Sequence, residues 1–337
     1  TGNSNTAVGC QSLKSNTTGF RNSAVGFNSL NQNTTGAGNV ALGYLTLCAN
    51  TTGNCNSGIG FRVLEKNTSG RYNSAIGQNA LFSNTTACCN SAMGFNTLFT
   101  NTTGQRNVGI GTCSLFANTT ANNNTAVGTC AMMSNTTGTN NDAFGDSALI
   151  DNTTGNTNVA LGRLSLGDNT TGCCNVSIGN SSMRKNTTGQ QNVVIGRSAG
   201  QCNLTGSYNT AVGDQALRFN TNSNNTAVGS FSLCANTTGA RNTAVGNNAG
   251  LSQTTGNDNT SIGKGALCDL TTGSENTALG QRALESVVTT SNNTSVGASS
   301  MRNATGAGNV AIGVLSGADA MIDITSSFFC NFALRNL

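Results

Sequence analysis

Apolar and polar residues alternate along this chain in a pattern that returns every 17 residues. Asn-Thr-Ala-Val-Gly begins at Asn5, and close variants return at Asn22, Asn39 and at each later start up to Asn309. Numbered 1 to 17 from this asparagine, the repeat reads N-[TSV]-A-[VIL]-G-x-x-[AS]-L-x-x-N-T-T-G-x-x. Position 1 is Asn and position 5 is Gly in all nineteen starts, and position 4 is always apolar. Position 9 is Leu or Met in most repeats, with Gly200 and Gly250 among the exceptions.

Each repeat is too short for a pair of helices and carries strand and turn chemistry instead. The β-branched residues at positions 2 to 4 favour a short strand that ends at the glycine of position 5. Asn-Thr-Thr-Gly at positions 12 to 15 favours a turn. The sequence therefore predicts an all-β fold, a parallel β-solenoid or β-roll of about 18 coils of 17 residues. We expect the solenoid to cover residues 1–308.

Stacking of the coils places identical residues above one another. We expect an apolar row at position 4, another at position 9, and a row of hydrogen-bonded asparagine amides at position 1. Positions 3 and 4 are adjacent, so a strand points them to opposite faces, and only one of them fills the coil. We therefore expect the other face to be covered by side-by-side association, in a trimer, with end-to-end growth into a helical filament as a further option.

Charge is scarce and catalytic chemistry is missing from the sequence. Only 8% of residues are charged, and the net charge of +4 is spread along the chain without a basic stripe, so nucleic acid is not expected as a partner. No apolar run is long enough to span a membrane. The chain contains no His, and its acidic residues are isolated, so no general base or metal site is recognisable. We expect no enzyme activity, no metal and no cofactor.

Fourteen Asn-x-Ser/Thr sequons are assigned to position 12. In a eukaryotic secretory pathway such asparagines in an exposed turn would accept N-glycans, which would form a row along one edge of the solenoid. The alternative is that Asn-Thr-Thr-Gly is only good turn sequence, copied by duplication. The candidates are Asn16, Asn33, Asn50, Asn67, Asn84, Asn101, Asn118, Asn135, Asn152, Asn169, Asn186, Asn203, Asn236 and Asn303.

Thirteen cysteines favour disulfides in an extracellular chain. Cys113 and Cys130 occupy position 7 of consecutive repeats, where stacking brings two Cα atoms within disulfide range. Two pairs of cysteines are adjacent in the sequence, and adjacent cysteines rarely bond to each other. These two pairs, and one cysteine near the end of the chain, are therefore candidates for cross-links between chains. These cross-link candidates are Cys88, Cys89, Cys173, Cys174 and Cys330. The alternative interpretation is that all are free thiols.

The repeat breaks after Gly317. Residues 309–337 hold the last partial repeat and an apolar segment, Phe328-Phe329-Cys330-Asn331-Phe332-Ala333-Leu334. A solenoid must cover its last coil, so this segment is expected to cap it. The alternative is a segment that joins one subunit to the next, with Cys330 locking the joint.

The repeat also resembles a known family of fibres. Asn-Ser-Ala-Val-Gly at Asn22, Asn-Ser-Ala-Ile-Gly at Asn73 and Asn-Thr-Ala-Val-Gly at Asn242 look like the repeats of trimeric autotransporter adhesin heads. The longer form with Asn-Thr-Thr-Gly is similar to repeats of phage tail fibres and other secreted fibre proteins. The resemblance implies a left-handed parallel β-roll that trimerises, although the repeat here is longer than in the adhesin heads.

These observations predict an extracellular structural fibre or filament subunit, non-catalytic and surface-glycosylated, whose partner is itself. The alternative function is an adhesin or a receptor-binding rod of the phage tail-fibre type. The repeat describes how the fibre is built and leaves its ligand open.

Overall fold

The computed structural model describes residues 2–318 and 327–329. It divides into two compact units, unit 1 over Thr1–Thr171 and unit 2 over Gly172–Leu337, and we describe each by itself. No α-helix occurs in the described residues, and so none there is long and apolar enough to cross a membrane. Each unit is a parallel β-solenoid, a stack of coils of about 17 residues as predicted, and the two units share about 18 coils.

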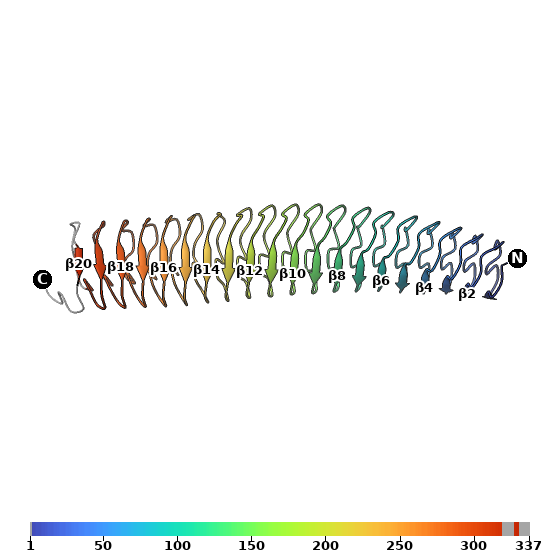
Figure 1. The fold of residues 1–337 in the computed structure, drawn as a ribbon, viewed down its shortest axis with the longest axis horizontal. Coiled ribbons are helices and arrows are strands. Elements are labelled where there is room, and N and C mark those ends of the chain that lie inside the picture. Colours follow the sequence, from blue (N-terminus) through green and yellow to red (C-terminus); the bar gives the residue numbers. More distant parts are fainter. Residues whose placement is uncertain (1, 319–326, 330–337) are drawn as a thin grey trace. The chain divides into compact units, whose positions relative to one another are not determined.

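Every coil contributes one three-residue strand at positions 2 to 4 of its repeat. In unit 1 these strands run in parallel, each beside the next (Figure 1). The strands of unit 1 are β1 (Thr6–Val8), β2 (Ser23–Val25), β3 (Val40–Leu42), β4 (Ser57–Ile59), β5 (Ser74–Ile76), β6 (Ser91–Met93), β7 (Val108–Ile110), β8 (Thr125–Val127), β9 (Asp142–Phe144) and β10 (Val159–Leu161).

Unit 2 repeats the arrangement with ten further parallel strands. The strands are β11 (Val176–Ile178), β12 (Val193–Ile195), β13 (Thr210–Val212), β14 (Thr226–Val228), β15 (Thr243–Val245), β16 (Thr260–Ile262), β17 (Thr277–Leu279), β18 (Thr294–Val296), β19 (Val310–Ile312) and β20 (Ser327–Phe329). Identical positions pair in register even across the first shortened repeat, where Thr210 pairs with Thr226. The missing residue therefore comes out of the turn and leaves the strand ladder intact.

The alanine of position 3 and the leucine of position 9 form the core of each coil. Ala24 and Leu30 are both fully buried, and the same two positions are buried throughout most of the stack. Leu30 has φ of +51°. A left-handed backbone in a non-glycine residue is uncommon, so the bend that aims this leucine inwards is held by the packing around it. Small residues at position 3 allow the strand to lie close to the leucine of position 9.

The glycine of position 5 ends each strand because no other residue fits there. Gly111 has φ of +128°, and a Cβ atom on it would lie 2.5 Å from the carbonyl oxygen of Gly128 in the next coil. Coils therefore stack at this corner with backbone against backbone. This explains why position 5 is glycine in every repeat.

The two asparagine positions form two internal amide ladders. At position 1, the Asn22 Nδ2 donates to the Gly36 carbonyl at 2.9 Å, and its Oδ1 accepts from the backbone N–H of Asn39 at 2.9 Å. At position 12, the Asn33 Nδ2 donates to Asn16 Oδ1 at 2.8 Å and to the Gly36 carbonyl at 3.0 Å. The sequence predicts the first ladder, but it does not predict the second. Both ladders satisfy polar groups that a coil with so thin a core would otherwise bury unpaired.

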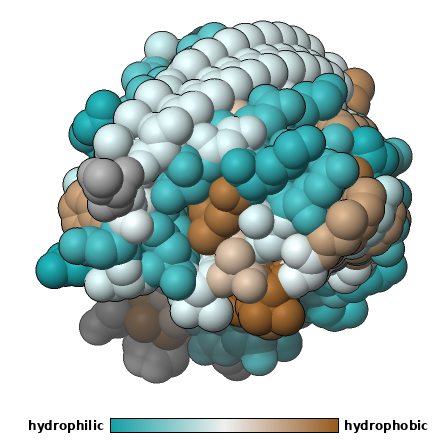
Figure 2. All heavy atoms as spheres, turned by 90° about the vertical axis from the view of Figure 1, so that its right-hand side faces the viewer, coloured by the Kyte–Doolittle hydropathy of each residue, from teal (hydrophilic) through white to brown (hydrophobic). Residues whose placement is uncertain are grey.

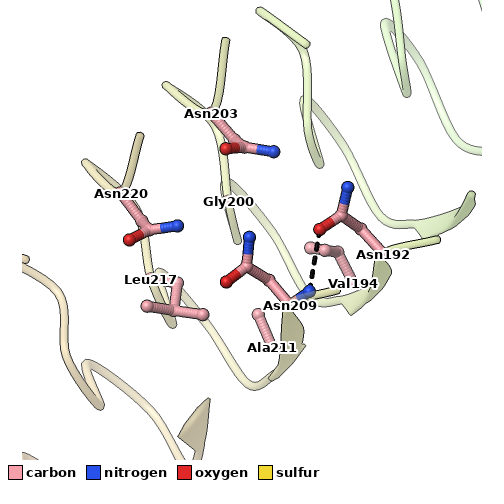
Figure 3. Close-up of a pocket in the computed structure, with 8 residues that line it drawn as sticks. All are labelled: Asn192, Val194, Gly200, Asn203, Asn209, Ala211, Leu217 and Asn220. Carbon is pink, nitrogen blue, oxygen red and sulfur yellow. Dashed lines mark hydrogen bonds between the residues drawn. The ribbon is translucent and has the colours of Figure 1, made fainter. Parts of the chain in front are cut away.

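Two complete coils of unit 2, at Gly200 and Gly250, replace the core leucine of position 9 by glycine. Beneath Gly200 lies a cavity of about 10 Å³, lined by Val194, Ala211, Leu217 and four asparagines (Figure 3). Val194 fills part of the missing volume, since position 3 is Ala in most other repeats. At Gly250 the longer side chain of Gln253 stands at position 12 instead of asparagine, and its Oε1 lies 3.5 Å from where a Cβ of Gly250 would be. In both coils a larger neighbour partly offsets the lost leucine.

Candidate functional site

The most regular surface feature of each unit is the outward row of apolar side chains at position 4. In unit 1 its members are 36% to 56% exposed, except Val127, which is half-buried. In unit 2, Ile195, Val228, Val245 and Ile262 are each 37% exposed. We call this row the position-4 stripe. In unit 1 it consists of Val8, Val25, Leu42, Ile59, Ile76, Met93, Ile110, Val127, Phe144 and Leu161. The structure thus resolves the choice between positions 3 and 4: alanine fills the coil and the larger residue faces outwards.

Residues at position 2 share the outward face with the position-4 stripe. A shallow hollow of about 70 Å³ lies between the two rows. Ser74 and Ser91 line it from position 2, and the position-4 stripe contributes Ile76, Met93 and Ile110. Brown apolar side chains stay visible between pale and teal rows in the space-filling view of the N-terminal end (Figure 2). The strand face is therefore a band of apolar side chains flanked by small hydroxyl or apolar ones.

Aromatic rings form two further columns in unit 1. At position 6, Phe27, Tyr44 and Phe61 stack with ring centroids 5.5 and 5.1 Å apart. They are 43% to 45% exposed. At position 10, Phe82, Phe99 and Phe116 stack at 5.0 and 5.3 Å. The sequence interpretation missed both columns because these positions vary along the chain, although the 17-residue spacing of the aromatic residues would have revealed them.

Twelve of the fourteen sequon asparagines are buried and do not lie in an exposed turn. From Asn33 to Asn203, and again at Asn236, their side chains are buried. The Nδ2 atom, to which an N-glycan would be linked, donates within the position-12 ladder, as Asn118 does to Asn101 Oδ1 at 2.8 Å. The expectation of an exposed asparagine row is therefore wrong. A glycan at these atoms requires the ladder to open, because its bond would replace a buried hydrogen-bond donor.

The two ends of the candidate series differ from the rest. Asn16 is half-buried, and its Nδ2 donates to the Gly19 carbonyl at 3.0 Å. Asn303 is exposed, and the buried slot of position 12 is taken by Ala304. The assignment of Asn303 to position 12 is thus wrong by one residue, because the shortened repeat shifts the turn.

Every cysteine in the described part of the chain carries a free thiol. Cys113 and Cys130 stand at the same place in consecutive coils, and both are half-buried. Burial raises the pKa of the Cys113 thiol, and the nearby Cys130 raises it further. Their proximity agrees with the predicted pair, while the disulfide itself stays a prediction. Cys330 lies outside the described residues, as does most of the proposed cap, of which β20 pairs in parallel with β19.

The vicinal cysteines occupy positions 16 and 17 of their repeats, at the surface. Cys88 and Cys173 are half-buried, whereas Cys89 and Cys174 are exposed. Each inner thiol faces a glutamine of the following coil: Cys88 Sγ donates to Gln105 Oε1 at 3.3 Å, and Cys173 Sγ donates to Gln190 Oε1 at 3.2 Å. Their role in cross-links between chains stays a prediction.

Near the start of unit 1, a second surface hollow interrupts the row of side chains at positions 16 and 17. Its volume is about 430 Å³, and it forms where Ala37 and Gly38 replace the larger residues of positions 16 and 17. Phe20 and Arg21 border it on one side, and Cys55 borders it on the other. Among the described residues, no three His, Cys, Asp or Glu side chains gather in a way that could hold a metal ion.

Comparisons with known proteins add no family to these observations. No protein-family description matches the chain, and no curated protein is significantly similar to it in sequence. The β-solenoid is therefore established by its geometry, and the resemblance to autotransporter heads and tail fibres stays a prediction.

Proposed function

We propose that the chain is a non-catalytic structural subunit of an extracellular fibre, and that copies associate side by side through the position-4 stripe. The single observation that carries the proposal is the exposure of an apolar residue at position 4 of nearly every coil. Contiguous apolar surface of this kind is rare on monomers and marks sites of association.

A second copy of this chain fits the stripe better than an unrelated partner. Its own stripe has the same repeat, so side chains of one copy meet the gaps between coils of the other along the whole contact. If each of ten side chains exposes on the order of 60 Å², one unit offers about 600 Å², close to the roughly 800 Å² per partner of a specific interface. The exposed position-2 row adds to this area.

The internal structure supports a mechanical role. Backbone groups of each coil bond to the next coil, and three side-chain ladders repeat these bonds, including the Thr34 hydroxyl that donates to the Thr51 carbonyl at 3.1 Å. A chain with this many lateral bonds and 8% charged residues suits a passive extracellular element.

Replacing stripe residues by lysine tests the proposal. The triple variant Ile76→Lys, Met93→Lys, Ile110→Lys places charge on the outward face without touching the core. We expect sedimentation velocity and electron microscopy to show multimers of the wild-type chain and monomers of the variant. The matched control is Thr86→Lys, Thr103→Lys, Thr120→Lys, which adds the same charge at exposed position 14 and should leave assembly unchanged. A monomeric wild-type chain, or loss of assembly in the control alone, contradicts the proposal.

The second candidate, a receptor-binding rod, is favoured by one observation, the hollow at Ala37 and Gly38. Its volume of about 430 Å³ falls within the range of small-ligand sites. Filling it with Gly38→Arg should abolish adhesion of the fibre to its target surface if the hollow takes part. Unchanged adhesion removes this candidate.

A further inference from the structure

Positions 16 and 17 of unit 1 form a surface ridge that is basic and carries thiols. It contains Arg21, Arg71 and Arg106, and no acidic residue occurs at these positions in unit 1. The imbalance extends beyond the ridge, since Glu65 is the sole acidic residue before Asp142 in the sequence, against six Lys and Arg. We call these two columns the basic ridge.

The pair Cys88–Cys89 lies between two arginines of the basic ridge. The Cys89 N–H donates to the Arg71 carbonyl of the preceding coil at 3.0 Å, and the Arg106 N–H of the following coil donates to the Cys88 carbonyl at 3.2 Å. Both guanidinium-bearing residues and Cys89 are exposed, so the thiol and the charges meet the same solvent. Tyr72 and Gln105 complete the neighbouring positions of the ridge, and neither brings a negative charge at neutral pH.

The two thiols of the pair are not equivalent. Burial raises the pKa of Cys88, and the charge of Cys89 and a hydrogen bond with it raise the pKa further, against the smaller opposing effect of Arg106 and Arg71. Adjacent thiols resist double ionisation, so one of them ionises first. Cys88 is half-buried and donates to Gln105 Oε1, whereas Cys89 is exposed, so Cys89 is the thiol that a partner's disulfide can reach.

The second vicinal pair offers a natural comparison. Cys173–Cys174 has the same positions, the same exposure and the same hydrogen bond to a glutamine. In unit 2, the repeat after it holds Gln190 and Gln191 at positions 16 and 17, where the repeat after Cys88–Cys89 holds Gln105 and Arg106. The two pairs therefore differ mainly in the arginines.

We propose that Cys89 is a covalent attachment site for a partner whose disulfide is flanked by carboxylates. The arginines attract such a partner and orient its carboxylates, whereas a symmetric bond between Cys89 of two copies would bring four arginines together. Cross-linking between copies of this chain is thus directed to the uncharged pair Cys173–Cys174. The proposal goes beyond the fibre function and does not depend on side-by-side association.

The reaction is a thiol–disulfide exchange that needs no other oxidant. The Cys89 thiolate attacks one sulfur of the partner's disulfide, the partner's S–S bond breaks, and the other sulfur leaves with the electron pair and takes a proton from water. Cys89 is oxidised to a mixed disulfide, and the leaving thiol is reduced. Cys88 cannot readily displace the partner, because Cα atoms of neighbouring residues lie about 3.8 Å apart, closer than an unstrained disulfide requires.

Competition between the two pairs in one chain tests the proposal. The full reduced chain is incubated with oxidised glutathione, an anionic disulfide, and in parallel with cystamine, a cationic one, and mixed disulfides are located by peptide mass spectrometry. With oxidised glutathione, we expect Cys89 to react about fivefold faster than Cys174 at low salt, and this preference should shrink at high salt. With cystamine, the preference should disappear or reverse.

Variants separate charge from exposure. The double variant Arg71→Gln, Arg106→Gln should bring the rate at Cys89 to that at Cys174, and Gln191→Arg, in the same unit as Cys174, should raise the rate at Cys174. A peptide disulfide rich in aspartate, tested beside glutathione, shows whether a protein segment or a small disulfide reacts faster. Equal rates at Cys89 and Cys174 with oxidised glutathione, or a preference that ignores salt and both sets of variants, overturn the proposal.

Discussion

Position 12 has opposite chemistry in two regions of the molecule. From Asn33 to the end of unit 1, and in unit 2 as far as Asn236, it holds a buried asparagine ladder. In the later coils of unit 2 the same slot holds Gln253 and then Leu270, Val287 and Ala304, which join an apolar cluster. The backbone of the coil is unchanged, because Leu270 N–H still donates to the Leu267 carbonyl as Asn118 N–H does to Leu115. The fold therefore accepts either chemistry at this position.

Apolar residues can replace the asparagine ladder of position 12 because the carbonyl group that accepts from this ladder also accepts from the position-1 asparagine. In ladder coils the Gly104 carbonyl accepts from Asn101 Nδ2 at 3.0 Å and from Asn90 Nδ2 at 2.8 Å. In the apolar coils the position-1 asparagine alone serves this carbonyl, as Asn259 serves Gly273 at 2.8 Å. The change from amide to apolar side chains costs stability at the junction between the two regions, where Asn236 Oδ1 and Gln253 Oε1 are buried without a hydrogen-bond partner.

Interrupting the ladder in unit 1 should have the largest effect. Asn101→Leu removes the donor to Asn84 Oδ1 and one of the two acceptors of Asn118 Nδ2, which leaves the buried Asn84 Oδ1 unpaired and Asn118 Nδ2 with the Ala121 carbonyl alone. We expect a loss of about 3 kcal/mol in the free energy of unfolding, measured by urea denaturation followed by far-UV circular dichroism.

Gln253→Leu, the matched variant at the junction, should not lower the free energy of unfolding. Gln253→Leu removes an unpaired Oε1, and the Gly256 carbonyl keeps its bond from Asn242 Nδ2 at 2.8 Å. We expect unchanged or higher stability. Equal losses for the two variants would show that a continuous ladder does not matter.

An asparagine placed at position 12 of the apolar coils should lower the free energy of unfolding less in the coil next to the junction than in a coil farther away. Val287→Asn buries an amide between Leu270 and Ala304, where no side chain can pair with it, and should cost about 3 kcal/mol. Leu270→Asn also loses apolar burial, but its Nδ2 can reach the unpaired Gln253 Oε1. We expect it to cost about 1 kcal/mol less than Val287→Asn by the same measurement. The reverse order would refute this account of the junction.

Sequence periodicity predicts the coil but not the fate of each polar residue. Gly111 and Leu30 could be assigned to a corner and a core because glycine and leucine have few other uses at a fixed spacing. Asn33 could not, since the same Asn-Thr-Thr-Gly letters suit an exposed turn and a buried ladder alike. Only the stacked geometry shows that its amide meets Asn16 in one coil and the amide of Asn50 in the next. Likewise, the sequence left positions 3 and 4 as alternatives, because strand alternation fixes that they oppose each other without fixing which one faces inwards.

The coil at Gly200 tests whether a larger residue at position 3 replaces a missing leucine. Val194→Ala should enlarge the cavity beneath Gly200 and lower the free energy of unfolding by about 1 kcal/mol. Val193→Ala, on the exposed face of the same strand, is the control and should change stability by less than about 0.5 kcal/mol. If the two changes were equal, Val194 would not compensate for the leucine.

The smallest expected effect concerns the surface columns at positions 16 and 17, which lack acids in unit 1 but pair charges in unit 2. Arg241 Nε donates to Asp258 Oδ1 at 2.7 Å, and this bond lowers the pKa of Asp258 below its usual value. A carboxyl whose pKa is depressed by folding stabilises the folded chain at pH above its unfolded pKa, near 4, and loses that contribution as pH falls through the folded pKa. Asp258→Asn should therefore lower the melting temperature slightly at pH 7 in low salt, and the difference from wild type should vanish at acid pH and at high salt. A difference that persists at pH 2 would mean that Asp258 acts through packing and not through its charge.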